Sequence, residues 1–179
     1  MSKYRRYFDN LNKPVFITIV TYNRKNILIE NINILKNSIK YVKSKYNFEI
    51  VAISILKNHF HMILLPEISN EIPQIIRTIK YNFSINIPSV YITKDLSNSA
   101  IKRGEKGVWQ RRYYDHIIRS EEDLKNHIDY IHYNSWKNHK ISPKDWKYSS
   151  FIKFVKNNYY DENWCDFDEK VNINQSNWD

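Results

Sequence analysis

Glycine and cysteine are nearly absent from this sequence. Gly104 and Gly107 are the only glycines among 179 residues, so neither a phosphate-binding loop nor a dinucleotide fingerprint can be written. The single cysteine, Cys165, excludes an internal disulfide and a zinc site made of several thiolates. No apolar run reaches the roughly 18 residues of a membrane span, and the start lacks the apolar core of a signal peptide. The sequence therefore predicts a soluble cytoplasmic protein that does not associate with membranes.

Acidic residues are the scarcer charged class. Lys and Arg number 28 against 19 Asp and Glu, which gives a formal charge of +9. Cations placed along a phosphate backbone release its counterions, so this excess favours a polyanionic partner. Aromatic residues make up 15% of the chain, and flat rings beside cations suit single-stranded nucleic acid. Composition alone fits an ordinary solvated basic surface equally well.

The pattern of apolar residues predicts one α+β domain. Alternating segments rich in β-branched residues predict strands at 15–22, 48–56, 60–65 and 112–118. Helical spacing predicts helices over 30–46, from 72 to a stop at Pro88, and from a capping box at Ser120 to about Ser135. Residues 88–108 are expected to form a loop with one short strand at most. The order is β-α-β-β-α-β, a ferredoxin-like antiparallel sheet with helices on one face, followed by a third helix and a C-terminal extension.

Two histidines stand inside an apolar strand, in the stretch Asn58-His59-Phe60-His61. Residues i and i+2 of a strand project from the same face, so His59 and His61 point together. Two adjacent imidazoles supply half of a metal site. One surface histidine beside one hydrogen-bonded core histidine is the alternative, and the pattern alone leaves both open.

The third predicted helix carries a tyrosine beside its apolar stripe of Leu124, Ile128 and Ile131. Helical periodicity places Tyr130 and Asn134 one turn apart on a neighbouring polar stripe. A half-buried packing tyrosine is the ordinary interpretation. A nucleophilic tyrosine needs a partner that activates it, because a free phenol has a pKa of about 10.

Taken together, these residues resemble the HUH motif and nucleophile of single-tyrosine transposases, and more closely those of the REP-associated tyrosine transposases. The matching stretches run in the family's order from residue 4 to about residue 155. Two departures stand out: Ser135 occupies a position that is usually proline, and Leu56-Lys57-Asn58 replaces Met-Pro-Asn. The stretches are Tyr4-Arg5-Arg6-Tyr7, Asn58-His59-Phe60-His61, Leu65-Pro66, Trp109-Gln110-Arg111-Arg112-Tyr113-Tyr114-Asp115-His116, Asp129-Tyr130-Ile131-His132-Tyr133-Asn134 and Asp145-Trp146-Lys147-Tyr148-Ser149-Ser150.

The resemblance implies a transposase domain over residues 1–155 and a C-terminal extension over 156–179. It implies a metal-dependent endonuclease that cuts and rejoins single-stranded DNA, in which His59 and His61 hold Mg²⁺ or Mn²⁺ and Asn134 is a third ligand. Tyr130 would be the nucleophile that forms a 5′-phosphotyrosine.

Interleaved cations and rings are expected to bind the DNA at hairpins or palindromic repeats. The protein is expected to be a monomer or a homodimer. The residues expected to bind DNA are Tyr4, Arg5, Arg6, Arg111 and Arg112.

Two other functions remain open. One is a non-catalytic nucleic-acid-binding module on a ferredoxin-like sheet. The combination of His59, His61 and Tyr130 argues against it, because binding alone needs no such set. The other is an HUH replication initiator or relaxase, which shares the chemistry. The short chain, with no room for a helicase domain, argues against that.

Overall fold

Four strands form one antiparallel sheet in the computed structural model, which describes residues 12–93 and 95–165. The strand order is β2-β3-β1-β4, and each neighbouring pair is antiparallel. This is the order that the ferredoxin-like β-α-β-β-α-β arrangement requires, so the predicted fold class is confirmed. The strands are β1 Val15–Val20, β2 Phe48–Ile55, β3 His59–Pro66 and β4 Tyr114–Ile117.

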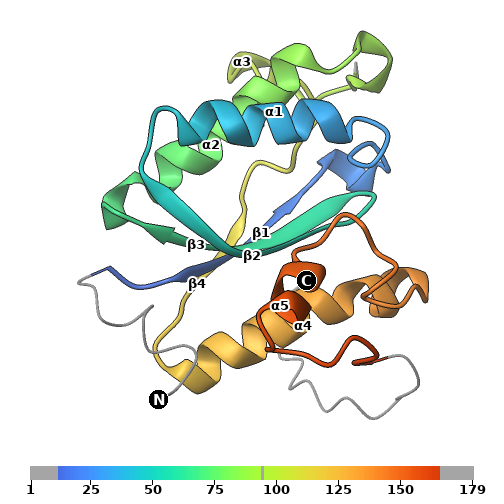
Figure 1. Cartoon of the computed structure of the whole chain (residues 1–179). Helices are drawn as coiled ribbons and strands as arrows, with labels where there is room; N and C mark the ends of the chain where they lie inside the picture. The colour runs from blue at the N-terminus through green and yellow to red at the C-terminus, as the bar shows by residue number, and fades with distance from the viewer. Residues whose placement is uncertain (1–11, 94, 166–179) are drawn as a thin grey trace.

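The two helices inserted between strands, α1 (Ile32–Lys43) and α2 (Ile72–Asn86), cover one face of the sheet (Figure 1). Side chains alternate along a strand, so one set from β1 and β3 meets these helices. A cluster of buried hydrophobic residues joins them. It includes Ile17, Ile19, Leu35, Val42, Phe60, Met62, Leu64, Ile75, Ile79 and Phe83.

The opposite face of the sheet is covered by α4 (Glu121–His139) and the short α5 (Phe151–Lys156) (Figure 1). Ser120 caps α4, since its side chain accepts a hydrogen bond from the backbone N–H of Asp123 at 3.1 Å. A second apolar cluster joins this helix to the sheet. It includes Phe16, Ala52, Ile63, Leu124, Ile128, Ile131 and Phe154.

Two expectations about the irregular parts of the chain need correction. Residues 88–108 were expected to form a loop with one short strand at most. The described residues there form a 3₁₀ turn, Ser89–Tyr91, and a short helix, α3 (Asn98–Lys102). Ser97 starts that helix by accepting a hydrogen bond from the backbone of Ala100. The second correction is that α4 continues four residues beyond Ser135. A serine keeps the backbone N–H that a proline lacks, so the helix ends only at His139.

Residues after α5 pack back on α4. The hydroxyl of Tyr160 donates to Asp129 at 2.6 Å, and its ring stacks on Trp164 with centroids 4.6 Å apart. The division of the chain at residue 155 stays a prediction. None of the helices in the described ranges is long and apolar enough to cross a membrane.

Candidate active site

His59 and His61 lie on the face of β3 that α4 covers. Both are buried, with 3% and 0% of their surface exposed. Their ring centroids are 4.9 Å apart and the rings are nearly perpendicular, at 84°. The strand period therefore places the two imidazoles side by side, as predicted.

Each imidazole is oriented through its Nδ1 atom. Nδ1 of His61 lies 2.8 Å from the hydroxyl oxygen of Thr18, and Nδ1 of His59 lies 2.6 Å from Oδ1 of Asn58. The amide nitrogen of Asn58 donates to Asn26, so its oxygen accepts the proton that His59 carries on Nδ1. The other nitrogen of His59, Nε2, then carries the lone pair that a metal ion requires.

Tyr130 of α4 reaches the histidine pair from across the helix–sheet boundary. Its ring centroid lies 5.2 Å from that of His61 and 6.0 Å from that of Phe16. Only 1% of Tyr130 is exposed. The structure therefore brings the predicted tyrosine and one of the predicted histidines into contact in a buried site.

Lys137 is a neighbour of Tyr130 that sequence reasoning missed. Its Nζ lies 5.3 Å from the centroid of the Tyr130 ring, within the range of a cation–π interaction. Residues i and i+7 lie two turns apart on one side of a helix. That spacing is the signal that could have found Lys137.

Asn134 lies one turn beyond Tyr130 and is fully buried. Its amide nitrogen donates to the backbone oxygen of Tyr130 at 2.7 Å, and its Oδ1 accepts from the Nδ2 of Asn138 at 2.9 Å. Asn138 stands there because α4 continues past Ser135. The predicted third ligand thus lies on the tyrosine's helix, with its amide oxygen already engaged by a neighbour.

A polar row that was also missed crosses the sheet beneath α4. Thr18 of β1 pairs with His61 on one side and with Tyr114 of β4 on the other. On the far side of His61, its partner in β2 is the buried Ser54. Serine and threonine are common in strands, so only the observed register identifies this row.

The predicted DNA-binding residues fall into two groups. Tyr4, Arg5 and Arg6 lie outside the described residues. Arg111 and Arg112 are exposed, immediately before β4. Arg111 borders a hollow of about 230 Å³ whose lining also includes Lys80, Tyr81, Ser84, Lys106 and Trp109.

Lys80 ties this segment to α2. Its Nζ donates to the backbone oxygens of Gln110 at 2.7 Å and Arg111 at 3.0 Å. Burial lowers the pKa of Lys80 to about 8, against a smaller opposing effect of Glu105. Trp109 donates in turn to the backbone oxygen of Lys80 at 3.1 Å. The two exposed arginines therefore stand on a segment with a fixed backbone.

Comparison with known proteins identifies the family. The family described as "Transposase IS200 like" matches residues 12–134. The chain belongs to this family. Within it, the chain is 39% identical over 167 residues to a putative REP-associated tyrosine transposase of Haemophilus influenzae, covering 92% of this chain and 93% of that protein. It is 30% identical to the REP-associated tyrosine transposase of Escherichia coli, covering 92% of each.

A solved structure of a REP-associated tyrosine transposase bound to a REP hairpin has the same fold. It aligns with a TM-score of 0.70 and 31% identity over 92% of each chain. Family, fold and enzyme class thus agree with the resemblance seen in the sequence. The chain is a transposase of the REP-associated tyrosine type.

Proposed function

We propose that this transposase cuts and rejoins single-stranded DNA with Tyr130 as its nucleophile, at a divalent metal held by His59 and His61. The observation that carries the proposal is the 5.2 Å separation between the rings of Tyr130 and His61 inside one buried site. A tyrosine of α4 and a histidine of β3 are far apart in sequence, and a binding module has no need to bring them together.

The donor set suits a divalent metal. Two imidazoles are available as nitrogen ligands, and each is oriented by a hydrogen bond at its Nδ1, the arrangement usual for metal-binding histidines. Asn134 would join as an oxygen ligand by exchanging its bond with Asn138. When bound, Mg²⁺ or Mn²⁺ would polarise the scissile phosphate and stabilise the charge that develops on it.

Tyr130 performs the covalent step. Its hydroxyl loses its proton and the oxygen forms a bond to phosphorus, while the bond from phosphorus to the 3′-oxygen breaks. The 3′-oxygen leaves as a hydroxyl after taking up a proton, and a 5′-phosphotyrosine remains. The positive charge of Lys137 lies over the ring of this tyrosine. Attack by a 3′-hydroxyl reverses the step, so no nucleotide is consumed.

Access to Tyr130 requires a movement of its surroundings. With 1% of its surface exposed, the tyrosine meets a phosphate only after the side chains over it are displaced. Lys137 is one of them, and a basic side chain can follow the phosphate as it enters.

The substrate we propose is single-stranded DNA folded into hairpins or palindromic repeats. The related transposase of similar structure is bound to a REP hairpin. In this chain, Arg111 and Arg112 are exposed, Arg111 lines a hollow together with Lys80 and Lys106, and the excess of cations suits phosphates. Tyr4, Arg5 and Arg6 would add stacking and charge.

A covalent adduct tests the nucleophile. A 3′-labelled hairpin incubated with the protein and Mn²⁺ should give a labelled product that survives denaturation. Tyr130→Phe should lose it. Tyr133→Phe is the matched control, because Tyr133 lies on the same helix and burial, with the nearby thiol of Cys165, raises its pKa. A label mapped by peptide sequencing to any tyrosine other than Tyr130 would overturn the assignment.

Metal and substrate are tested separately. His59→Ala should abolish cleavage and leave hairpin binding largely intact, and a chelator should have the same effect on the unchanged protein. Hairpin binding should weaken steeply with salt, since each phosphate contact releases counterions. Cleavage by His59→Ala in chelator, or equal affinity for blunt duplex, contradicts the proposal.

A further inference from the structure

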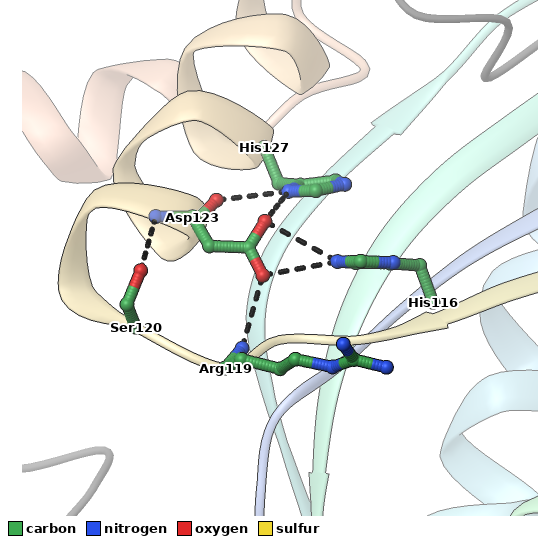
Figure 2. A network of polar contacts seen from close by, with 5 residues as sticks. All are labelled: His116, Arg119, Ser120, Asp123 and His127. Carbon is green, nitrogen blue, oxygen red and sulfur yellow. Dashed lines mark hydrogen bonds and ion pairs between the residues drawn. The ribbon is translucent and has the colours of Figure 1, made fainter.

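A second cluster of metal-ligating side chains lies where α4 faces β4. Figure 2 shows the imidazoles of His116, from β4, and His127, from α4, side by side and both directed at the carboxylate of Asp123. Nε2 of His116 lies 3.0 Å from Oδ2 and 3.3 Å from Oδ1 of that carboxylate. Nδ1 of His127 lies 3.0 Å from Oδ1 and 2.8 Å from the backbone oxygen of the same aspartate. None of these residues belongs to the site proposed for cleavage.

The spacing of the ligand atoms is close to that of a four-coordinate zinc site. Bonds of about 2.0–2.1 Å to nitrogen and oxygen in a tetrahedron place neighbouring ligand atoms about 3.3 Å apart. The three nitrogen–oxygen separations above are 3.0–3.3 Å. One ligand atom from each residue can be chosen so that all lie within 4.8 Å of one another.

The carboxylate at the centre is held in place. Its Oδ2 accepts a hydrogen bond from the backbone N–H of Arg119 at 2.9 Å (Figure 2). The backbone N–H of the same aspartate donates to Ser120 at 3.1 Å. The two imidazole rings are stacked, with centroids 4.8 Å apart and planes at 13°. Preorganised ligands with hydrogen-bonded oxygens are what metal sites require.

The cluster is partly open to solvent. About a third of the His116 side chain is exposed, so solvent can supply a water ligand.

We propose that His116, Asp123 and His127 form a structural site for a divalent transition metal, with Zn²⁺ as the ion that fits the two nitrogen ligands and one oxygen ligand. The metal takes the place of the imidazole protons that point at Asp123. His127 gives up the contact of its Nδ1 with the backbone oxygen of that aspartate. Each ring stays neutral by carrying its proton on its other nitrogen, and water completes the coordination. Mg²⁺ is excluded by the same argument, because it prefers oxygen ligands in an octahedron.

The consequence concerns the helix that carries Tyr130. A metal here would join the first turn of α4 to the edge strand β4. The ring of Phe16 lies 4.7 Å from that of His127 and 5.6 Å from that of His61, so it packs between the cluster and the histidine pair. Fixing α4 on the sheet would therefore fix the distance between Tyr130 and the strand opposite it.

Zinc binding by the full-length, tag-free protein tests the site. Substitution of His59 and His61 separates it from the site proposed for cleavage. In a His59→Ala/His61→Ala variant, titration calorimetry should find one Zn²⁺ per chain, and Zn²⁺ should raise the melting temperature whereas Mg²⁺ should not. Adding His116→Ala should weaken Zn²⁺ binding at least tenfold, since removal of outer-shell partners alone already costs about 10–100-fold. His139→Ala is the matched control and should change nothing.

The unchanged protein gives a second measurement. It should bind one Zn²⁺ more than the single variant His116→Ala, whose substitution lies on an edge strand and leaves the core intact. The proposal is overturned if the variant without His59 and His61 binds no Zn²⁺, or if His116→Ala binds as many ions with the same affinity. In that case the cluster is a metal-free hydrogen-bond network. Loss of DNA cleavage has no bearing on this result.

Discussion

The two faces of the sheet are built from the same strands but for different purposes. The face under α1 and α2 is filled by side chains such as Ile17, Phe60 and Met62, and the part of the chain that the structure describes buries no charged side chain or imidazole there. The face under α4 buries Thr18 and His61 beside apolar neighbours. The first face supplies stability, and the second combines packing with groups that do chemistry.

Polar groups such as Thr18 and Asn134 are tolerated on the second face because they have partners. An imidazole or hydroxyl removed from water without a hydrogen bond costs about 1–3 kcal/mol on the scale of protein mutations. Here Thr18 lies within hydrogen-bond distance of His61, and Asn134 bonds to Tyr130 and Asn138. Apolar residues of α4 and β3, Leu124 and Ile63 among them, provide the burial that holds the helix on this face.

Substitutions at two adjacent residues of β3 should show the difference between the two faces most clearly. Phe60 points to the apolar face and His61 to the other, and both are fully buried. Phe60→Ala should cost about 3–5 kcal/mol of unfolding free energy. His61→Ala should cost less, because the imidazole gains less from burial, and should abolish cleavage if the proposed function is right. Urea denaturation and hairpin nicking of both variants measure the two effects. Equal losses of stability, or an active His61→Ala variant, would remove the distinction between the faces.

Strand periodicity explains why the sequence predicted one half of the site. The two-residue repeat of β3 places His59 and His61 together whatever the rest of the chain does. The helical repeat likewise places Tyr130 one turn from Asn134. Both rules are local. The predicted order of strands and helices was enough to place the strand with the histidines and the helix with the tyrosine in one domain.

Contacts made by packing and by helix length could not be predicted in the same way. His116 comes from β4 while Asp123 and His127 come from α4, so only the docking of that helix on the sheet joins them. The bond from Asn138 to Asn134 depends on α4 running through Ser135, where the sequence predicted that the helix ends.

Lys80 is a cation at the edge of the apolar face, and its titration tests the contribution of that face to stability. Burial lowers its pKa from 10.5 to about 8, so between these values the unfolded chain holds a proton that the folded chain has released. Stability contributed by this group therefore rises as the pH increases from about 8 to about 10.5. The groups that face it are Glu105, Trp109 and Arg111.

The measurement is the difference in unfolding free energy between the unchanged protein and Lys80→Met across that range. The difference should grow with pH in favour of the unchanged protein, and the titration of all other groups cancels. A matched control is Lys36→Met, since Lys36 lies exposed on α1. A difference that stays flat, or that falls with pH, contradicts the assigned direction.

Lys137 tests the polar face with a smaller effect. Its cation lies over the Tyr130 ring, an interaction worth about 0.5–2 kcal/mol. Lys137→Met keeps the length of the side chain and removes the charge, so it should slow adduct formation about twofold to thirtyfold at fixed Mn²⁺. Lys125→Met, on an exposed part of the same helix where Lys125 pairs with Asp129, should leave the rate unchanged. Equal rates for both variants would mean that the charge above the ring plays no part.

The smallest expected effect concerns the role of Asn134 on that face. It distinguishes a metal ligand from a helix-packing residue. If its Oδ1 joins the metal, the bond from Asn138 must first be broken, and that bond is worth about 0.5–1.5 kcal/mol. Asn138→Ala removes the competing donor, so Mn²⁺ should bind about twofold to tenfold more tightly. Asn138 is exposed, which keeps the fold intact. Asn134→Ala should weaken Mn²⁺ binding and cancel the gain when combined with Asn138→Ala. If both single variants bind Mn²⁺ like the unchanged protein, Asn134 is a packing residue, and the two histidines need a ligand from elsewhere.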